Sequence, residues 1–104
     1  MDTAYDEKRK FPRIPAECPI LYKLAQHDKW ILAKLFDLSA TGFSMICTQK
    51  IESNTHMAFQ VKKCSNTLVP ELSGQCEVRR SIINQNGDYI VSCKILKIDR
   101  NQPA

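Results

Sequence analysis

The stretch that decides the fold is residues 74–98, GQCEVRRSIINQNGDYIVSCKILKI. Apolar and polar side chains alternate on both sides of QNGD at residues 85–88, and such alternation is typical of half-buried strands. An Asn-Gly pair between two runs of this kind predicts an antiparallel hairpin with a tight type I′ turn. In the first run, strict alternation places Cys76, Val78 and Arg80 on one face of the strand.

Four runs upstream of this hairpin have the same β character and are separated by short polar breaks. No window has a helical period bounded by caps, although Ala, Leu and Lys leave a helix open as the alternative for residues 30–38. Six short strands at intervals of about 8–12 residues predict an all-β fold, either a small barrel or a sandwich. The expected strands are residues 19–26, 30–39, 42–49, 56–63, 74–83 and 89–98.

The large apolar residues of these runs are expected to form the core. The run at residues 30–39 is apolar on both faces, and we assign its aromatic side chains to the interior as well. The aromatic residues are therefore interpreted as packing residues and not as a surface on which bases stack. The predicted packing residues are Tyr22, Trp30, Phe36, Phe43, Met45, Phe59 and Tyr89.

The chain of 104 residues has room for one core. Residues 1–15 are polar and charged and contain two prolines that keep their predecessors out of the helical region, which predicts a flexible N-terminal arm. Residues 16–99 form the predicted β-domain, and residues 100–104 are expected to be a disordered tail.

The composition narrows the class of partner. A formal net charge of +4 favours anionic partners only mildly, and dedicated duplex-DNA-binding proteins usually have a stronger basic surface. No run approaches the ~18 apolar residues of a membrane span, and the N-terminus has no apolar segment typical of a secretory signal. We therefore expect a cytoplasmic location, no membrane insertion and no nucleic-acid partner.

The five cysteines are odd in number and irregularly spaced, without a C-x-x-C pair or a histidine cluster. In a reducing compartment this pattern predicts buried free thiols and neither a metal site nor a disulfide framework. No pair of nucleophile and base, metal-ligand set or phosphate-binding glycine loop is recognisable, so we expect neither an enzyme nor a bound cofactor.

Two short motifs carry the functional prediction. KRKFPR at residues 8–13 contains an R-x-x-x-R pattern, and DLSATG at residues 37–42 is a D-x-S-x-x-G pattern. Alone, a basic run is usually a solvated tail, and Asp or Ser at a strand end often bonds to nearby backbone. Together, in this order and on a chain of this length, the motifs resemble the PilZ domain family of bacterial cyclic di-GMP receptors. The resemblance extends from about Lys8 to Ile98.

The resemblance implies a small six-stranded antiparallel β-barrel with a flexible N-terminal arm, as a single-domain member. Arg9 and Arg13 match the family's two arginines, which hold guanine and phosphate groups. Lys8 and Lys10 stand where many members have further arginines, which leaves open whether one cyclic di-GMP or a pair binds. Because ordering ten residues costs on the order of 10 kcal/mol, we expect residues 1–10 to be mobile without the ligand and to close over it.

In the second motif, Asp37 and Ser39 match the family's polar pair and Gly42 matches its glycine. The chemistry of these side chains agrees with that role. A guanidinium can pair with guanine O6 and N7 or with phosphate oxygens, and a carboxylate can accept from guanine N1–H and N2–H₂. A serine hydroxyl can donate to a phosphate oxygen, and glycine allows a tight turn or a close backbone approach.

The sequence therefore predicts a non-enzymatic cyclic di-GMP receptor or adaptor that changes its arm conformation and signals in trans. Its effector would serve motility, pilus assembly, polysaccharide synthesis or virulence. Two alternatives are a PilZ-like adaptor that no longer binds the nucleotide and a small β-barrel that binds single-stranded nucleic acid. Arg79 and Arg80 are expected on opposite faces of their strand, where one can reach the ligand, although a solvent-facing charge is the preferred interpretation.

Overall fold

The computed structural model describes residues 14–15, 18–64 and 69–99, and the predicted mobile arm at residues 1–10 and tail at 100–104 lie outside these ranges. The described residues form strands and no helix. The strands are β1 (Ile14–Pro15), β2 (Pro19–Leu24), β3 (Ile31–Leu38), β4 (Gly42–Cys47), β5 (His56–Val61), β6 (Leu72–Ile83) and β7 (Tyr89–Ile98). Accordingly, no described helix is long and apolar enough to cross a membrane.

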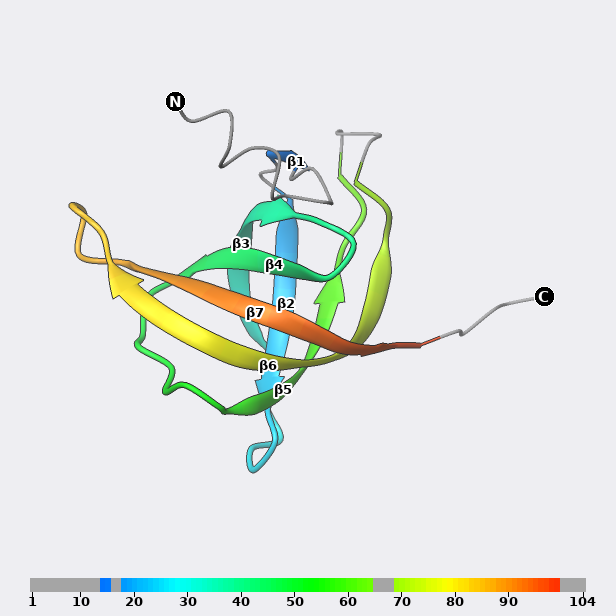
Figure 1. Cartoon of the computed structure of the whole chain (residues 1–104), viewed down its shortest axis with the longest axis horizontal. Coiled ribbons are helices and arrows are strands. Elements are labelled where there is room, and N and C mark those ends of the chain that lie inside the picture. The colour runs from blue at the N-terminus through cyan, green and yellow to red at the C-terminus, as the bar shows by residue number, and fades with distance from the viewer. Residues whose placement is uncertain (1–13, 16–17, 65–68, 100–104) are drawn as a thin grey trace, which may run out of the picture.

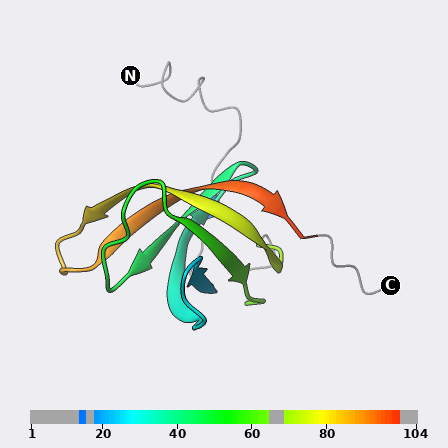
Figure 2. The same cartoon turned by 90° about the horizontal axis from the view of Figure 1, so that it is seen from below.

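The strands form one closed antiparallel sheet. Their order is β1-β3-β2-β5-β6-β7-β4, and β4 pairs with β3 as well, so the six longer strands close into a barrel (Figure 1). In Figure 2 the sheet curves around its interior, with β6 and β7 arching over β2 and β3. The predicted six-stranded antiparallel β-barrel is confirmed, and the helix alternative for residues 30–38 is wrong. The two-residue strand β1 is an addition that the sequence pattern did not indicate.

The β6–β7 hairpin is confirmed, but its turn is not the predicted type I′. Asn84 N–H donates to the Asp88 carbonyl at 2.8 Å, which leaves three residues in the loop. Gly87 has a φ of 87°, whereas Asn86 has no positive φ, and a type I′ turn needs positive φ at both central residues. The Asn84 side chain accepts from the backbone N–H of Asn86 at 2.8 Å and of Asp88 at 3.0 Å, which favours the longer loop.

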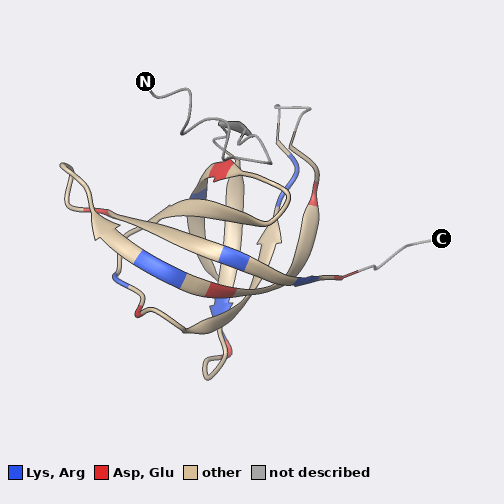
Figure 3. Ribbon diagram, in the orientation of Figure 1, with Lys and Arg blue, Asp and Glu red and all other residues tan. Residues whose placement is uncertain are grey.

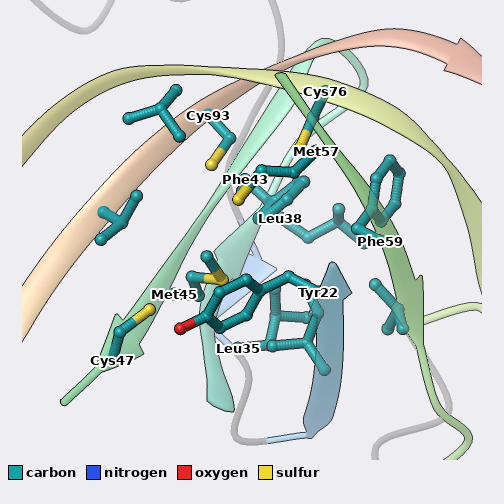
Figure 4. Close-up of a cluster of buried hydrophobic side chains, with 14 of the residues drawn as sticks. Tyr22, Leu35, Leu38, Phe43, Met45, Cys47, Met57, Phe59, Cys76 and Cys93 are labelled. Atoms are coloured by element: carbon teal, nitrogen blue, oxygen red, sulfur yellow. The ribbon is translucent and has the colours of Figure 1, made fainter. Parts of the chain in front are cut away.

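The barrel interior is aromatic and rich in sulfur (Figure 4). The rings of Phe43 and Phe59 lie 4.9 Å apart between centroids, and Tyr22 is fully buried, with its hydroxyl accepting from Gln49 Nε2 at 2.8 Å. The sulfur-bearing residues of the core are Cys18, Met45, Cys47, Met57, Cys76 and Cys93.

Two of the predicted core aromatics lie outside the core. Trp30 is 39% exposed and Phe36 is 45% exposed, so their assignment to the interior is wrong. Strand β3 presents Ala33 and Leu35 to the core, and the alternation of a strand sends their neighbours outward. The other predicted packing residues are buried or half-buried, as expected.

The prediction of five free thiols is wrong for two of them. Cys18, which precedes β2, forms a disulfide with Cys64, which follows β5, and their Cα atoms are 5.4 Å apart. The antiparallel register of β2 and β5 pairs Ile20 with Val61 and thereby brings the two cysteine positions alongside each other.

The remaining three cysteines are free and buried, as predicted. Burial raises the pKa of the Cys47 thiol to about 11. The pKa of Cys93 is raised by its hydrogen bond with Cys76 and by burial. Cys47 and Cys93 therefore stay protonated at neutral pH.

Candidate functional site

The D-x-S-x-x-G motif forms the end of β3 and the turn into β4. The backbone N–H and the hydroxyl of Ser39 both donate to the Gly42 carbonyl, at 2.9 and 3.2 Å. The Thr41 carbonyl accepts from Ile95 N–H at 2.9 Å and ties this turn to β7. Ser39 therefore bonds to nearby backbone, as serine at the end of a strand often does, and these hydrogen bonds hold the turn in place.

Gly42 is required by the packing of two strands. It pairs with Lys94 of β7, and a Cβ atom at this position would overlap the Cys93 carbonyl oxygen. The glycine thus permits the close approach of β4 to β7. Any role toward a ligand comes in addition to this structural one.

A β-bulge positions Asp37. The β3–β4 register pairs Leu35 with Met45 and then Asp37 with Ser44, so Phe36 is the extra residue. Without the bulge, strict alternation from Leu35 would send Asp37 into the core. With the bulge, Leu38 enters the core instead, and Asp37 lies half-buried at the outer surface.

A second bulge positions Arg80 in the same way. The β6–β7 register pairs Val78 with Cys93 and then Arg80 with Ser92, so Arg79 is the extra residue. The expectation that the two arginines lie on opposite faces is wrong, because the bulge leaves both of them exposed. Arg79 Nη1 lies 3.5 Å from Glu77 Oε1, whereas Arg80 forms no such ion pair with another described residue.

The two bulges put Asp37 and Arg80 on one row across four strands. Asp37 pairs with Ser44, Ser44 pairs with Ser92, and Ser92 pairs with Arg80. We name these four residues the outer strip. The Oγ atoms of Ser44 and Ser92 are 3.4 Å apart, and three strand spacings put the ends of the strip about 14 Å apart. Its middle consists of small hydroxyl side chains and its ends are oppositely charged.

The two serines were not singled out from the sequence. A signal for them exists, since Ser44 and Ser92 are small polar residues at alternating positions between buried neighbours. Their pairing across β4 and β7 follows only from the register. Next to the strip, Lys94 pairs with Glu77, and Figure 3 marks positive and negative positions along β6 and β7, the strands that pass in front of β2 in this view.

The predicted basic motif lies outside the described residues, so the positions of Lys8, Arg9, Lys10 and Arg13 are not part of this geometry. The described chain resumes directly after this motif, in β1. There Ile14 pairs with Leu38 and Pro15 pairs with Asp37. The chain that follows the basic motif is thus hydrogen-bonded to the strand that carries the acidic one.

Other candidate sites are weaker. In the ranges 14–15, 18–64 and 69–99, no group of three or more His, Cys, Asp or Glu side chains could hold a metal ion. A shallow hollow of about 400 Å³ lies at the opposite end of β2, and neither Asp37, Ser39 nor Gly42 lines it. Its lining residues are Leu24, Ala25, Gln26, His27, Asn54, Thr55 and His56.

Comparison with known proteins agrees with this fold. The inhibitor of motility MotI/DgrA from Bacillus subtilis aligns with a TM-score of 0.71 at 13% identity, over 88% of this chain and 44% of that one. The chain therefore spans less than half of MotI/DgrA. The PilZ domain of YcgR from Escherichia coli, solved with c-di-GMP, aligns with a TM-score of 0.64 at 17% identity, over 86% of this chain and 79% of that one.

No curated protein sequence is significantly similar to the chain. At these identities the two solved structures establish a shared fold. The family model of the PilZ domain matches residues 7–104, nearly the whole sequence, and this match includes both motifs. The chain belongs to the PilZ domain family.

Proposed function

We propose that this protein is a receptor for cyclic di-GMP that binds the nucleotide between its basic motif and the outer strip. The observation that carries the proposal is the pair of bulges that turns Asp37 and Arg80 outward onto one row of strands. Bulges are often found where a sheet re-aims a functional side chain. The E. coli neighbour with the same fold was solved with c-di-GMP, which supports this choice of ligand.

The described residues fit the chemistry of such a ligand. Cyclic di-GMP is a dianion with two guanine bases, and the half-buried carboxylate of Asp37 suits the N1–H and N2–H₂ donors of guanine. The exposed guanidinium of Arg80 suits a phosphate or the O6 and N7 edge of the base. Between them, Ser44 is buried and Ser92 is half-buried, and both contribute small hydroxyl side chains to the middle of the strip. Ser39 and Gly42 contribute by fixing the turn.

Arg9 and Arg13 are proposed to supply further guanidinium groups, with Lys8 and Lys10 as additional cations. The pairing of Pro15 with Asp37 supports this, because Arg13 is only two residues before Pro15 in the chain. Ligand binding is expected to order the arm. Amide hydrogen exchange should therefore show greater protection of residues 1–10 with cyclic di-GMP than without it. Equal protection with and without the nucleotide would reject this arm movement.

We further propose that the receptor is not an enzyme and acts in the cytoplasm on a separate effector protein. The site combines a carboxylate, cations and hydroxyls that can bind and orient a nucleotide. Its serine hydroxyls are engaged with each other or with backbone, and among the described residues none of them is hydrogen-bonded to a general base. Binding and release of the nucleotide are therefore the proposed event.

Calorimetric titration of cyclic di-GMP into the wild-type protein and an Arg13→Ala variant tests the proposal. Saturable heat with the wild type and about 5- to 150-fold weaker binding by the variant are expected, since a bidentate arginine contact contributes about 1–3 kcal/mol. No heat from folded wild-type protein would reject the function. Equally tight binding by Arg13→Ala would reject the assignment of the basic motif and leave the function standing.

A matched pair of variants tests the outer strip. Arg80→Ala is expected to weaken cyclic di-GMP binding, whereas Arg79→Ala removes the same charge one residue away and is expected to bind like the wild type. Asp37→Asn is expected to reduce the preference for cyclic di-GMP over cyclic di-AMP, because adenine lacks the donors that the carboxylate accepts. Equal effects of both arginine variants would show that only the total charge matters.

A further inference from the structure

A second surface of the barrel, formed by the outward residues of β2, β3 and β5, combines apolar and basic side chains. The registers place Lys62, Pro19 and Lys34 in one row and Gln60, Leu21 and Leu32 in the next. In a third row Ala58 pairs with Lys23, and Lys23 lies over the ring of Trp30. Phe36 continues the same face along β3. We name these ten residues the apolar-basic face.

The apolar part of this face is unusually exposed. Leu32 is 69% exposed, Phe36 is 45% exposed and Trp30 is 39% exposed, although all three belong to or adjoin a central strand of the barrel. Large apolar side chains gathered on one exposed face mark an interaction surface more often than single exposed residues do. Strand β3 thus has apolar side chains on both faces, one set in the core and one set exposed on the outside of the barrel.

The charge of the face is of one sign. Its ten residues include Lys23, Lys34 and Lys62 and no carboxylate. Lys23 Nζ lies 5.3 Å from the centroid of the Trp30 ring, so cation and aromatic are already interleaved. An occupant that matches this surface presents apolar side chains flanked by carboxylates.

We propose that the apolar-basic face binds an acidic amphipathic helix of a partner protein. A strand cannot be added here, because β3 is paired with β4 on one side and with β2 and β1 on the other. The contact must therefore be made by side chains across the face. From Trp30 to Phe36 the face extends about 20 Å along β3, which corresponds to a helix of about 13 residues.

Two other occupants fit less well. A symmetric dimer through this face would bring the same three lysines of both copies together, and such like-charge contacts are unfavourable. An anionic membrane would have to accept Leu32 and Phe36 into hydrocarbon, and Lys34 lies between them on the same side of β3. Its ammonium would be carried into the apolar layer, whereas a carboxylate of a helix can meet it.

The test uses Trp30, the sole tryptophan of the chain, as its reporter. The full chain, without nucleotide, is titrated with a 14-residue tryptophan-free peptide that has leucines at helical spacing and flanking glutamates. A saturable blue shift of tryptophan emission is expected. A peptide with lysine in place of each glutamate should bind at least tenfold more weakly, and phosphatidylglycerol vesicles should give no shift.

Lys34→Glu is expected to weaken binding of the acidic peptide at least tenfold, as is Leu32→Asn. The matched control is Lys97→Glu on β7, which lies three strands from β2 in either direction around the barrel and should bind like the wild type. No shift with the acidic peptide, a shift with vesicles alone, or a concentration-dependent dimer that buries Trp30 would each overturn the proposal. Since no nucleotide is present, none of these results bears on cyclic di-GMP binding.

Discussion

Replacing Gly42 by alanine separates the structural role of the motif glycine from a role in ligand binding. The new Cβ would overlap the carbonyl oxygen of Cys93, and the obstacle is backbone, which cannot swing away as a flexible side chain can. β4 must therefore move away from β7, and the pairing of Gly42 with Lys94 is the first to be strained. The end of β3 and the turn that Ser39 closes move with it.

The magnitude follows from the cost of overpacking. Forcing an extra methyl into a filled site typically costs about 1–3 kcal/mol. For a domain of this size, each kcal/mol lowers the melting temperature by about 4–8 °C, so we expect Gly42→Ala to melt roughly 5–20 °C below the wild type. The same displacement shifts the turn of the acidic motif, so cyclic di-GMP binding should weaken together with stability.

Thermal unfolding followed by circular dichroism, with and without cyclic di-GMP, measures both effects. Gly74→Ala is the matched control, because its Cβ would likewise overlap a backbone carbonyl, that of Lys97, at a position outside the acidic motif and the outer strip. It should lose stability and, below its melting temperature, keep its affinity. A Gly42→Ala variant that melts within about 1 °C of the wild type but fails to bind would refute the packing argument and leave a pure ligand role.

Two further predictions concern the cysteines. Thiol titration of the unfolded, unreduced protein should find three reactive thiols instead of five. Reduction of the Cys18–Cys64 bond, which joins residues at a sequence separation of 46, should lower the free energy of unfolding by about 4 kcal/mol. Five thiols in protein taken from a reducing cytoplasm would mean that this bond is absent there. For Cys47, the raised pKa of about 11 means that the folded state disfavours the thiolate. The free energy of unfolding should therefore be highest below about pH 8.5 and should fall by roughly 2–3 kcal/mol as the pH rises toward 11. In urea unfolding measured at several pH values, a Cys47→Val variant should lack this part of the decrease.

The strands could be predicted because each depends on a local pattern. The runs that became β2 to β7 have polar breaks between them, and the hairpin signal at residues 85–88 lies in the sequence itself. The turn type was wrong because the side chain of Asn84 competes for the backbone donors of the loop. The disulfide could not be predicted, because it depends on the pairing of β2 with β5, which sequence spacing does not reveal.

The residues of the candidate site could be predicted from the sequence, but their directions could not, because these depend on how the strands pair. The motif residues Asp37, Ser39 and Gly42 were recognisable, but the direction in which Asp37 points depends on one extra residue in β3. Alternation alone assigns Arg80 to the core, and Phe36 was placed there because its strand is apolar on both faces. A period of two cannot indicate where a strand gains a residue, so every position after a bulge is assigned to the wrong face.

Strand β3 belongs to both proposed surfaces, and this has a consequence for signalling. Asp37 ends the outer strip and Phe36 ends the apolar-basic face, so adjacent residues at one bulge belong to the proposed nucleotide site and the proposed partner surface. The extra residue of a bulge is left out of the regular ladder, which makes this a place where a small backbone shift disturbs few hydrogen bonds. A ligand that pulls on Asp37 acts directly on the backbone that carries Phe36. Coupling between the two surfaces therefore needs no path through the core, whose close packing resists gradual deformation.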